Sequence, residues 1–122
     1  MAQDFRTLLK EIDREGDSER FFDIITIGDW FHLDIQASPL HDCIPREMHD
    51  DPDKYEAFQV NLSTTRGAIS YGSRGAWKDL QHRDWAGYFS AYQPAMLIGR
   101  EVPADTVQRI YEDLLEYAEN NT

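Results

Sequence analysis

Residues 22–35 read FDIITIGDWFHLDI and contain two β-rich runs separated by the dipeptide Gly28-Asp29. Glycine accepts the positive φ that a tight primed turn requires, so this stretch predicts a β-hairpin. Apolar and polar side chains alternate along the second run, which places one face of that strand in the core and leaves the other face polar. The core set is Phe31, Leu33 and Ile35, and the polar set is Trp30, His32, Asp34 and Gln36.

The same alternation recurs in residues 55–62, where Phe58, Val60 and Leu62 would point inward. Residues 64–67 then predict a turn, and residues 68–71 predict a further strand. Together with the hairpin, these segments indicate an antiparallel sheet of about four strands that is covered on one face.

Helical spacing appears near both ends of the chain. Phe5, Leu8, Leu9 and Ile12 follow the i, i+3, i+4, i+7 pattern, which predicts a helix over residues 4–15 that ends at Gly16. After residue 103 an apolar stripe predicts a second helix with an acidic outer face. The stripe consists of Val107, Ile110, Tyr111, Leu114, Leu115 and Ala118.

These elements predict a single α+β domain over residues 1–122. It would have two layers, with the N-terminal and C-terminal helices packed on one face of the sheet. Residues 84–92 fit two interpretations, either a short helix that begins at Asp84 or a strand over residues 87–92.

The 122-residue chain carries 12 basic and 23 acidic residues, a formal charge of -11. This charge disfavours direct binding to nucleic acid or to an anionic membrane surface. The single cysteine, the lack of a signal-peptide pattern and the lack of a membrane-spanning apolar run predict a cytoplasmic protein. Neither a phosphate-binding loop nor a dinucleotide motif is present, so no cofactor is expected.

Residues 38–53 form a long acidic segment with three prolines, and loops of this length in compact domains are often functional. Acidic clusters accelerate the capture of cationic partners, and exposed tryptophans anchor interfaces. The predicted partner-binding residues are Trp30, Asp42, Glu47, Asp50, Asp51, Asp53 and Glu56.

Three other sets of residues offer alternatives. His32, Asp34, His41 and Cys43 carry the donor types that zinc prefers, although their spacing matches no compact ligand motif. Cys43 with His41 or His49 as base is a further alternative, which the surrounding acids oppose because they raise a thiol pKa. The basic segment 66–83 could instead hold an anion through Arg66, Ser73, Arg74 and Lys78.

The sequence therefore predicts a non-enzymatic acidic protein that captures or inhibits a basic protein partner. In outline it resembles small acidic α+β inhibitors and immunity proteins, some of which would act by mimicking nucleic-acid charge. One alternative is a small metal- or ligand-binding protein or enzyme that uses either the group of His32, Asp34, His41 and Cys43 or the basic segment 66–83. Another is an acidic secretion or assembly chaperone that works as a homodimer.

Overall fold

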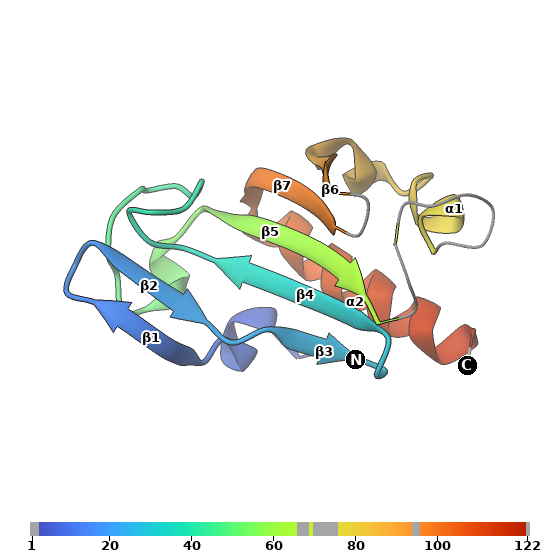
Figure 1. Ribbon diagram of the computed structural model, residues 1–122, viewed down its shortest axis with the longest axis horizontal. Helices are drawn as coiled ribbons and strands as arrows, with labels where there is room; N and C mark the ends of the chain where they lie inside the picture. Colours follow the sequence, from blue (N-terminus) through green and yellow to red (C-terminus); the bar gives the residue numbers. More distant parts are fainter. Residues whose placement is uncertain (1–2, 66–68, 70–75, 94–95, 122) are drawn as a thin grey trace.

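A computed structural model describes residues 3–65, 69, 76–93 and 96–121. It shows an α+β fold in which one long helix packs on a five-stranded antiparallel sheet of order β3-β4-β5-β7-β6, beside a separate hairpin β1-β2 (Figure 1). The strands are β1 (Glu11–Glu15), β2 (Glu19–Phe22), β3 (Ile25–Ile27), β4 (Phe31–Gln36), β5 (Ala57–Thr64), β6 (Phe89–Gln93) and β7 (Met96–Pro103). The helices are η1 (Phe5–Leu8), η2 (Pro52–Lys54), α1 (Trp77–Leu80), η4 (Asp84–Tyr88) and α2 (Ala104–Asn120).

The predicted turn at Gly28-Asp29 is confirmed. Gly28 and Asp29 have φ of +60° and +53°, and the Trp30 N–H donates to the Ile27 carbonyl oxygen at 3.0 Å. Positive φ at both central residues is the geometry that suits the right-handed twist of the flanking strands. The first strand of this hairpin starts at Ile25, because Phe22 belongs to β2 instead.

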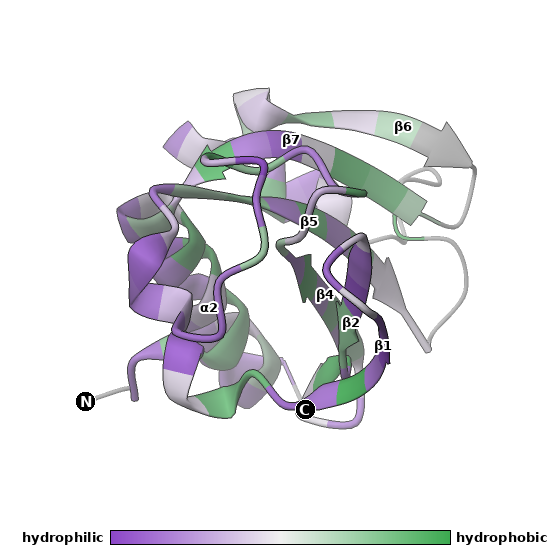
Figure 2. Cartoon of the chain, turned by 90° about the vertical axis from the view of Figure 1, so that its left-hand side faces the viewer, coloured by the Kyte–Doolittle hydropathy of each residue, from purple (hydrophilic) through white to green (hydrophobic). Residues whose placement is uncertain are grey.

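The core lies between the sheet and α2, as the alternation predicts. Phe31, Leu33 and Ile35 of β4 are fully buried, together with the inward side chains of β5. Figure 2 shows hydrophobic residues on the side of α2 that faces the sheet and hydrophilic residues on its outer side. The buried apolar residues of α2 are Val107, Ile110, Tyr111, Leu114 and Ala118.

The predicted helix over residues 4–15 is wrong. Asp4 caps only the short η1, and the chain then becomes extended in β1. Phe5 is buried, but Ile12 is 61% exposed, so the apolar spacing does not mark one continuous helical face. Gly16, with φ of +54°, lies in the turn between β1 and β2 rather than at a helix end.

Trp30 is also placed differently from the prediction. It lies in the turn before β4 and is only 9% exposed, stacked on Phe31 at a centroid distance of 4.8 Å and tilted against Tyr117 of α2. A residue in a turn does not follow the alternation of the neighbouring strand, so the assignment of Trp30 to the polar face was wrong. Trp30 stabilises the core and is not available as an exposed anchor.

The later part of the sheet differs from the expected four-strand meander. Both interpretations of residues 84–92 hold in part, because η4 covers Asp84–Tyr88 and β6 begins at Phe89. Strand β7 was not predicted, and it pairs with both β5 and β6. The strand predicted over residues 68–71 lies outside the described residues, except for the buried Ile69.

In the part of the chain that the structure describes, no helix combines the length and the apolar character needed to cross a bilayer.

Substitution of Gly28 tests the contact between the turn and α2. A Cβ atom at Gly28 would lie 2.9 Å from the Ala118 Cβ, whereas a Cβ at Gly16 meets nothing within 4 Å, and both residues have positive φ. Gly16→Ala should therefore lower the free energy of unfolding by about 1 kcal/mol, the conformational penalty alone. Gly28→Ala should lower it by at least about 1 kcal/mol more, because a packed helix must move.

Urea denaturation of the two variants measures this difference. Equal destabilisation by Gly16→Ala and Gly28→Ala would show that the close approach of α2 does not constrain residue 28.

Candidate functional site

Two segments far apart in sequence meet at one end of the molecule. The β1-β2 hairpin and the long connection from β4 to β5 lie side by side at the left of Figure 1. An ion pair joins them, since the Arg14 Nη1 atom lies 2.6 Å from an Asp50 carboxylate oxygen. The hairpin thus adds its own residues to the acidic segment that the sequence singled out.

Arg20 of β2 organises this end from the inside. It is 1% exposed, and its guanidinium donates to the carbonyl oxygens of Ala37 (2.6 Å) and His49 (2.7 Å) and to the Tyr55 hydroxyl (3.1 Å). Its charged head also lies 4.4 Å from the centroid of the Phe22 ring, which is a cation-π geometry. One buried side chain therefore connects the hairpin, the residue that follows β4, the acidic segment at His49, and Tyr55 just before β5.

The Tyr55 hydroxyl completes this network. It accepts from the His49 N–H at 2.9 Å and donates to the Glu47 carbonyl oxygen at 2.7 Å. Because the backbone at Glu47 and His49 is hydrogen-bonded to the buried Tyr55, the exposed Glu47 side chain extends from an ordered frame.

His41 and Cys43 lie inside the same segment and are both buried. The Ser38 hydroxyl lies 2.7 Å from the His41 Nδ1 atom, and the Cys43 thiol donates to the carbonyl oxygens of Ser38 and Pro45, each at 3.4 Å. Burial is the main cause that raises the pKa of the Cys43 thiol, and burial also lowers the pKa of His41. A raised pKa disfavours the thiolate form that a nucleophilic cysteine uses.

His32 and Asp34 lie apart from His41 and Cys43, on strand β4. Among the residues that the structure describes, no group of three or more histidine, cysteine, aspartate or glutamate side chains could hold a metal ion. The four alternative metal ligands therefore do not converge. Of the alternative anion-binding residues, Lys78 lies exposed on α1, whereas Arg66, Ser73 and Arg74 fall outside the described residues.

Several of the predicted partner-binding acids are engaged in contacts within the chain. Asp42 pairs with Arg100 at 3.1 Å and with Arg46 at 3.8 Å, and its carbonyl oxygen accepts from the Glu101 N–H at 2.9 Å. Glu47 lies 3.1 Å from a ring nitrogen of His49. These acids hold the segment in place in addition to giving it charge.

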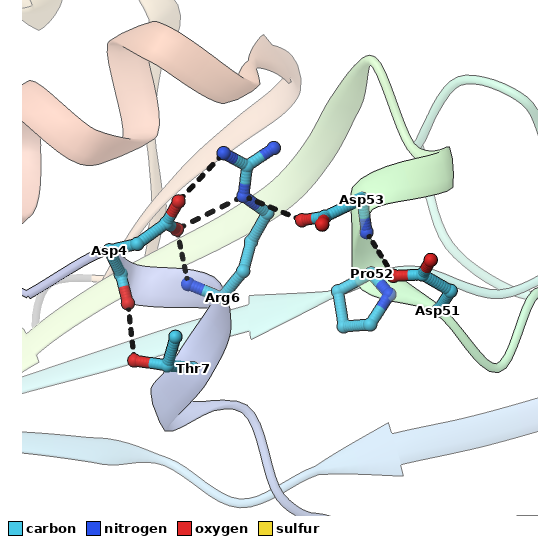
Figure 3. Close-up of a pocket in the computed structure, with 6 residues that line it drawn as sticks. All are labelled: Asp4, Arg6, Thr7, Asp51, Pro52 and Asp53. Carbon is cyan, nitrogen blue, oxygen red and sulfur yellow. Dashed lines mark hydrogen bonds and ion pairs between the residues drawn. The ribbon is translucent and has the colours of Figure 1, made fainter.

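The other edge of the segment is fastened to the N-terminal turn. Figure 3 shows the Arg6 side chain between Asp4 and Asp53, in a pocket of about 220 Å³. Arg6 donates twice to the Asp4 carboxylate, at 2.8 and 3.0 Å, and its Nε lies 3.3 Å from Asp53. Two carboxylates already pair with this guanidinium, so the contacts in this pocket hold the N-terminal turn against the acidic segment.

The last two predicted partner-binding acids lie nearby in sequence. Asp51 caps η2, and Glu56 is exposed.

The β1-β2 hairpin contributes acids that are not among the predicted partner-binding residues. We use "acidic end" for the exposed acids of the hairpin and of the neighbouring segment together. A signal for this hairpin was present, because Gly16-Asp17 repeats the dipeptide of the turn at residues 28–29. The acidic end consists of Glu11, Asp13, Glu15, Asp17, Glu47, Asp50, Asp51 and Asp53.

A groove of about 340 Å³ lies where the hairpin meets the outer face of β4. Two of its apolar residues are solvent-accessible, since Ile12 is 61% and Ile24 is 46% exposed. The Gln36 side chain forms one side, and its amide makes two 2.8 Å hydrogen bonds with the backbone of Phe22. We call this feature the hairpin groove. It is lined by Ile12, Asp13, Phe21, Phe22, Ile24, Asp34 and Gln36.

Asp34 is a carboxylate in a partly desolvated place within the hairpin groove. Burial raises its pKa, and hydrogen bonds from Gln36 (2.5 Å) and Asn61 oppose that shift. A raised folded pKa means that the folded state binds the proton more tightly than the unfolded state. The ionised carboxylate therefore lowers stability at neutral pH, and this loss disappears as the pH falls below the unfolded value near 3.8.

Asp34→Asn should for this reason raise the free energy of unfolding at pH 7 and have little effect at pH 3. Urea denaturation across this pH range measures the difference. Glu116→Gln removes a carboxylate from the exposed side of α2 and controls for the change in net charge. A destabilised Asp34→Asn protein at pH 7, or an effect that does not vary with pH, would contradict the assignment.

Removal of the Arg20 guanidinium should release the acidic segment. Arg20→Met leaves the buried Ala37 carbonyl oxygen and the partly buried His49 carbonyl oxygen without their donor, and it should destabilise the fold by about 3 kcal/mol. Hydrogen exchange at residues 38–56 should accelerate. Arg14→Met, which removes a surface cation from the same hairpin, should change exchange much less. Unchanged protection in Arg20→Met would show that the segment is held by other contacts.

The protein was compared with protein-family models, with curated proteins and with solved structures. None of the three comparisons found a match. The function of the acidic end therefore has to be inferred from its own residues.

Proposed function

We propose that this chain is a non-enzymatic binding protein that captures a basic protein partner through the acidic end. The observation that carries the proposal is the convergence of two acidic segments, the β1-β2 hairpin and residues 38–56, around the single buried Arg20. Charged side chains on an ordered frame lose less conformational freedom when a partner binds, so they recognise it more efficiently.

The charge distribution supports electrostatic capture. The formal charge of -11 is large for 122 residues, and the two segments that carry these acids lie side by side and are joined by the Arg14–Asp50 ion pair. Their fields add within the Debye length, which is about 10 Å at 0.1 M salt. Such a surface raises the association rate with a cationic partner and repels anionic competitors. A nucleic-acid-binding protein, whose own surface is basic, is a partner of this kind.

The placement of the chemically versatile residues favours binding over catalysis. Ser38, His41 and Cys43 are buried and hydrogen-bonded among themselves or to nearby backbone. A nucleophile needs access to its substrate, and these side chains lie beneath the surface that carries the acids. Their arrangement supports the shape of that surface.

A charge reversal on the acidic end tests the proposal. Glu15→Lys combined with Glu47→Lys should lower the association rate with the captured partner about tenfold at low salt. Both side chains are exposed, and neither bonds to Arg20. The protein is used as bait in a lysate of its natural host, and the captured proteins are expected to have isoelectric points above about 9.

The matched control is Glu112→Lys combined with Glu116→Lys, which makes the same change in net charge on the exposed side of α2. The control should retain the partner. Failure to recover any basic protein, or equal losses in the two double variants, would overturn the proposal.

A further inference from the structure

The hairpin groove combines an apolar surface with unmatched negative charge. Ile12, Phe21 and Ile24 supply side-chain surface that stays accessible to solvent, while Asp13 and Asp34 supply two carboxylates. Among the residues that the structure describes, no lysine or arginine lines this groove. Interface centres are typically apolar with a polar rim, so this composition fits a binding surface better than an ordinary solvated face.

The two kinds of lining residue match the two parts of a basic side chain. The methylene stem of lysine or arginine packs on apolar surface while its charged head seeks water or a carboxylate. A cation held by Asp34 would also favour the ionised carboxylate, which burial now disfavours. The walls would thus contact the stem, and the acids would contact the head.

We propose that the hairpin groove binds a segment of the basic partner in which a lysine or arginine lies next to an aliphatic residue. The cationic side chain enters the groove toward Asp34, and the aliphatic neighbour packs on Ile12 and Ile24. This inference rests on the proposed function, to which it adds the contact that follows electrostatic capture. The acidic end sets the rate of association with the partner, and the hairpin groove sets the rate of dissociation.

Charge argues against a second copy of this chain as the occupant. The groove adjoins the acidic end, so two copies that meet there would bring their hairpin acids together. Like charges placed against each other at an interface disfavour association. A cationic segment meets no such repulsion.

A phage-displayed library of random 12-residue peptides, selected on the intact protein, tests the proposal. Enriched peptides should carry a lysine or arginine beside an aliphatic residue. The best peptide should bind Asp34→Asn about tenfold more weakly than the unmodified protein, mainly through a faster dissociation rate. Replacement of its lysine or arginine by methionine should cause a similar loss in the unmodified protein and little further loss in Asp34→Asn, since the two changes remove the same contact.

Two further variants separate the contributions. Ile12→Ser combined with Ile24→Ser should weaken the peptide by removing the apolar walls, and both side chains are exposed enough for the fold to tolerate the change. Glu116→Gln, on the exposed side of α2, should bind the peptide as the unmodified protein does.

Several results would overturn the inference. They are enrichment of peptides without a basic residue, no enrichment at all, equal affinity for Asp34→Asn, and a dimer in sedimentation that Ile12→Ser with Ile24→Ser dissociates. A different result decides the proposed function. Capture of a basic protein that depends on Glu15 and Glu47, but not on Asp34 or the two isoleucines, would leave that function standing and remove the groove from it.

Discussion

The acidic end of the molecule depends on one buried cation. Arg20 has no carboxylate within ion-pair distance among the described residues, and its charge is stabilised by backbone carbonyl oxygens, a tyrosine hydroxyl and aromatic faces. Carbonyl dipoles have directions, whereas an ion pair tolerates many geometries. The guanidinium therefore fixes the positions of the chain segments around it, and an otherwise irregular stretch of sequence acquires a definite surface.

The sheet and its principal helix could be predicted from periodicity because each buries one face continuously. Alternation located β4 and β5, and the 3.6-residue stripe located α2. Periodicity does not predict an element whose backbone geometry interrupts the regular repeat of apolar residues. Strand β7 contains Glu101 at φ of +50°, and the pairing of β7 with β5 shifts register between Phe58 and Val60, so its alternation is interrupted. At the N-terminus, Phe5, Leu8 and Leu9 do contact the core, but through a short turn and not through a long helix.

The candidate site could be predicted only in part. Local composition identified the acidic segment, since charge density can be read from neighbouring residues. It could not show that Asp42 and Asp53 would meet Arg100 and Arg6, because those pairs join residues more than 40 positions apart. The hairpin groove was equally hidden. It is made where β1 and β2 fold beside β4, and its exposed isoleucines have the same sequence signature as core residues.

The attachment of the β1-β2 hairpin has a consequence for how this protein can change. The hairpin forms its own two-stranded sheet, and the Gln36 side-chain amide takes the place of a backbone ladder at its junction with β4. The turn between β1 and β2 can therefore change in length or sequence without shifting the register of the five-stranded sheet. The five-stranded sheet and the hairpin are thus separate units of one fold, and the hairpin turn around Gly16 and Asp17 is the part of the chain where insertions disturb the large sheet least.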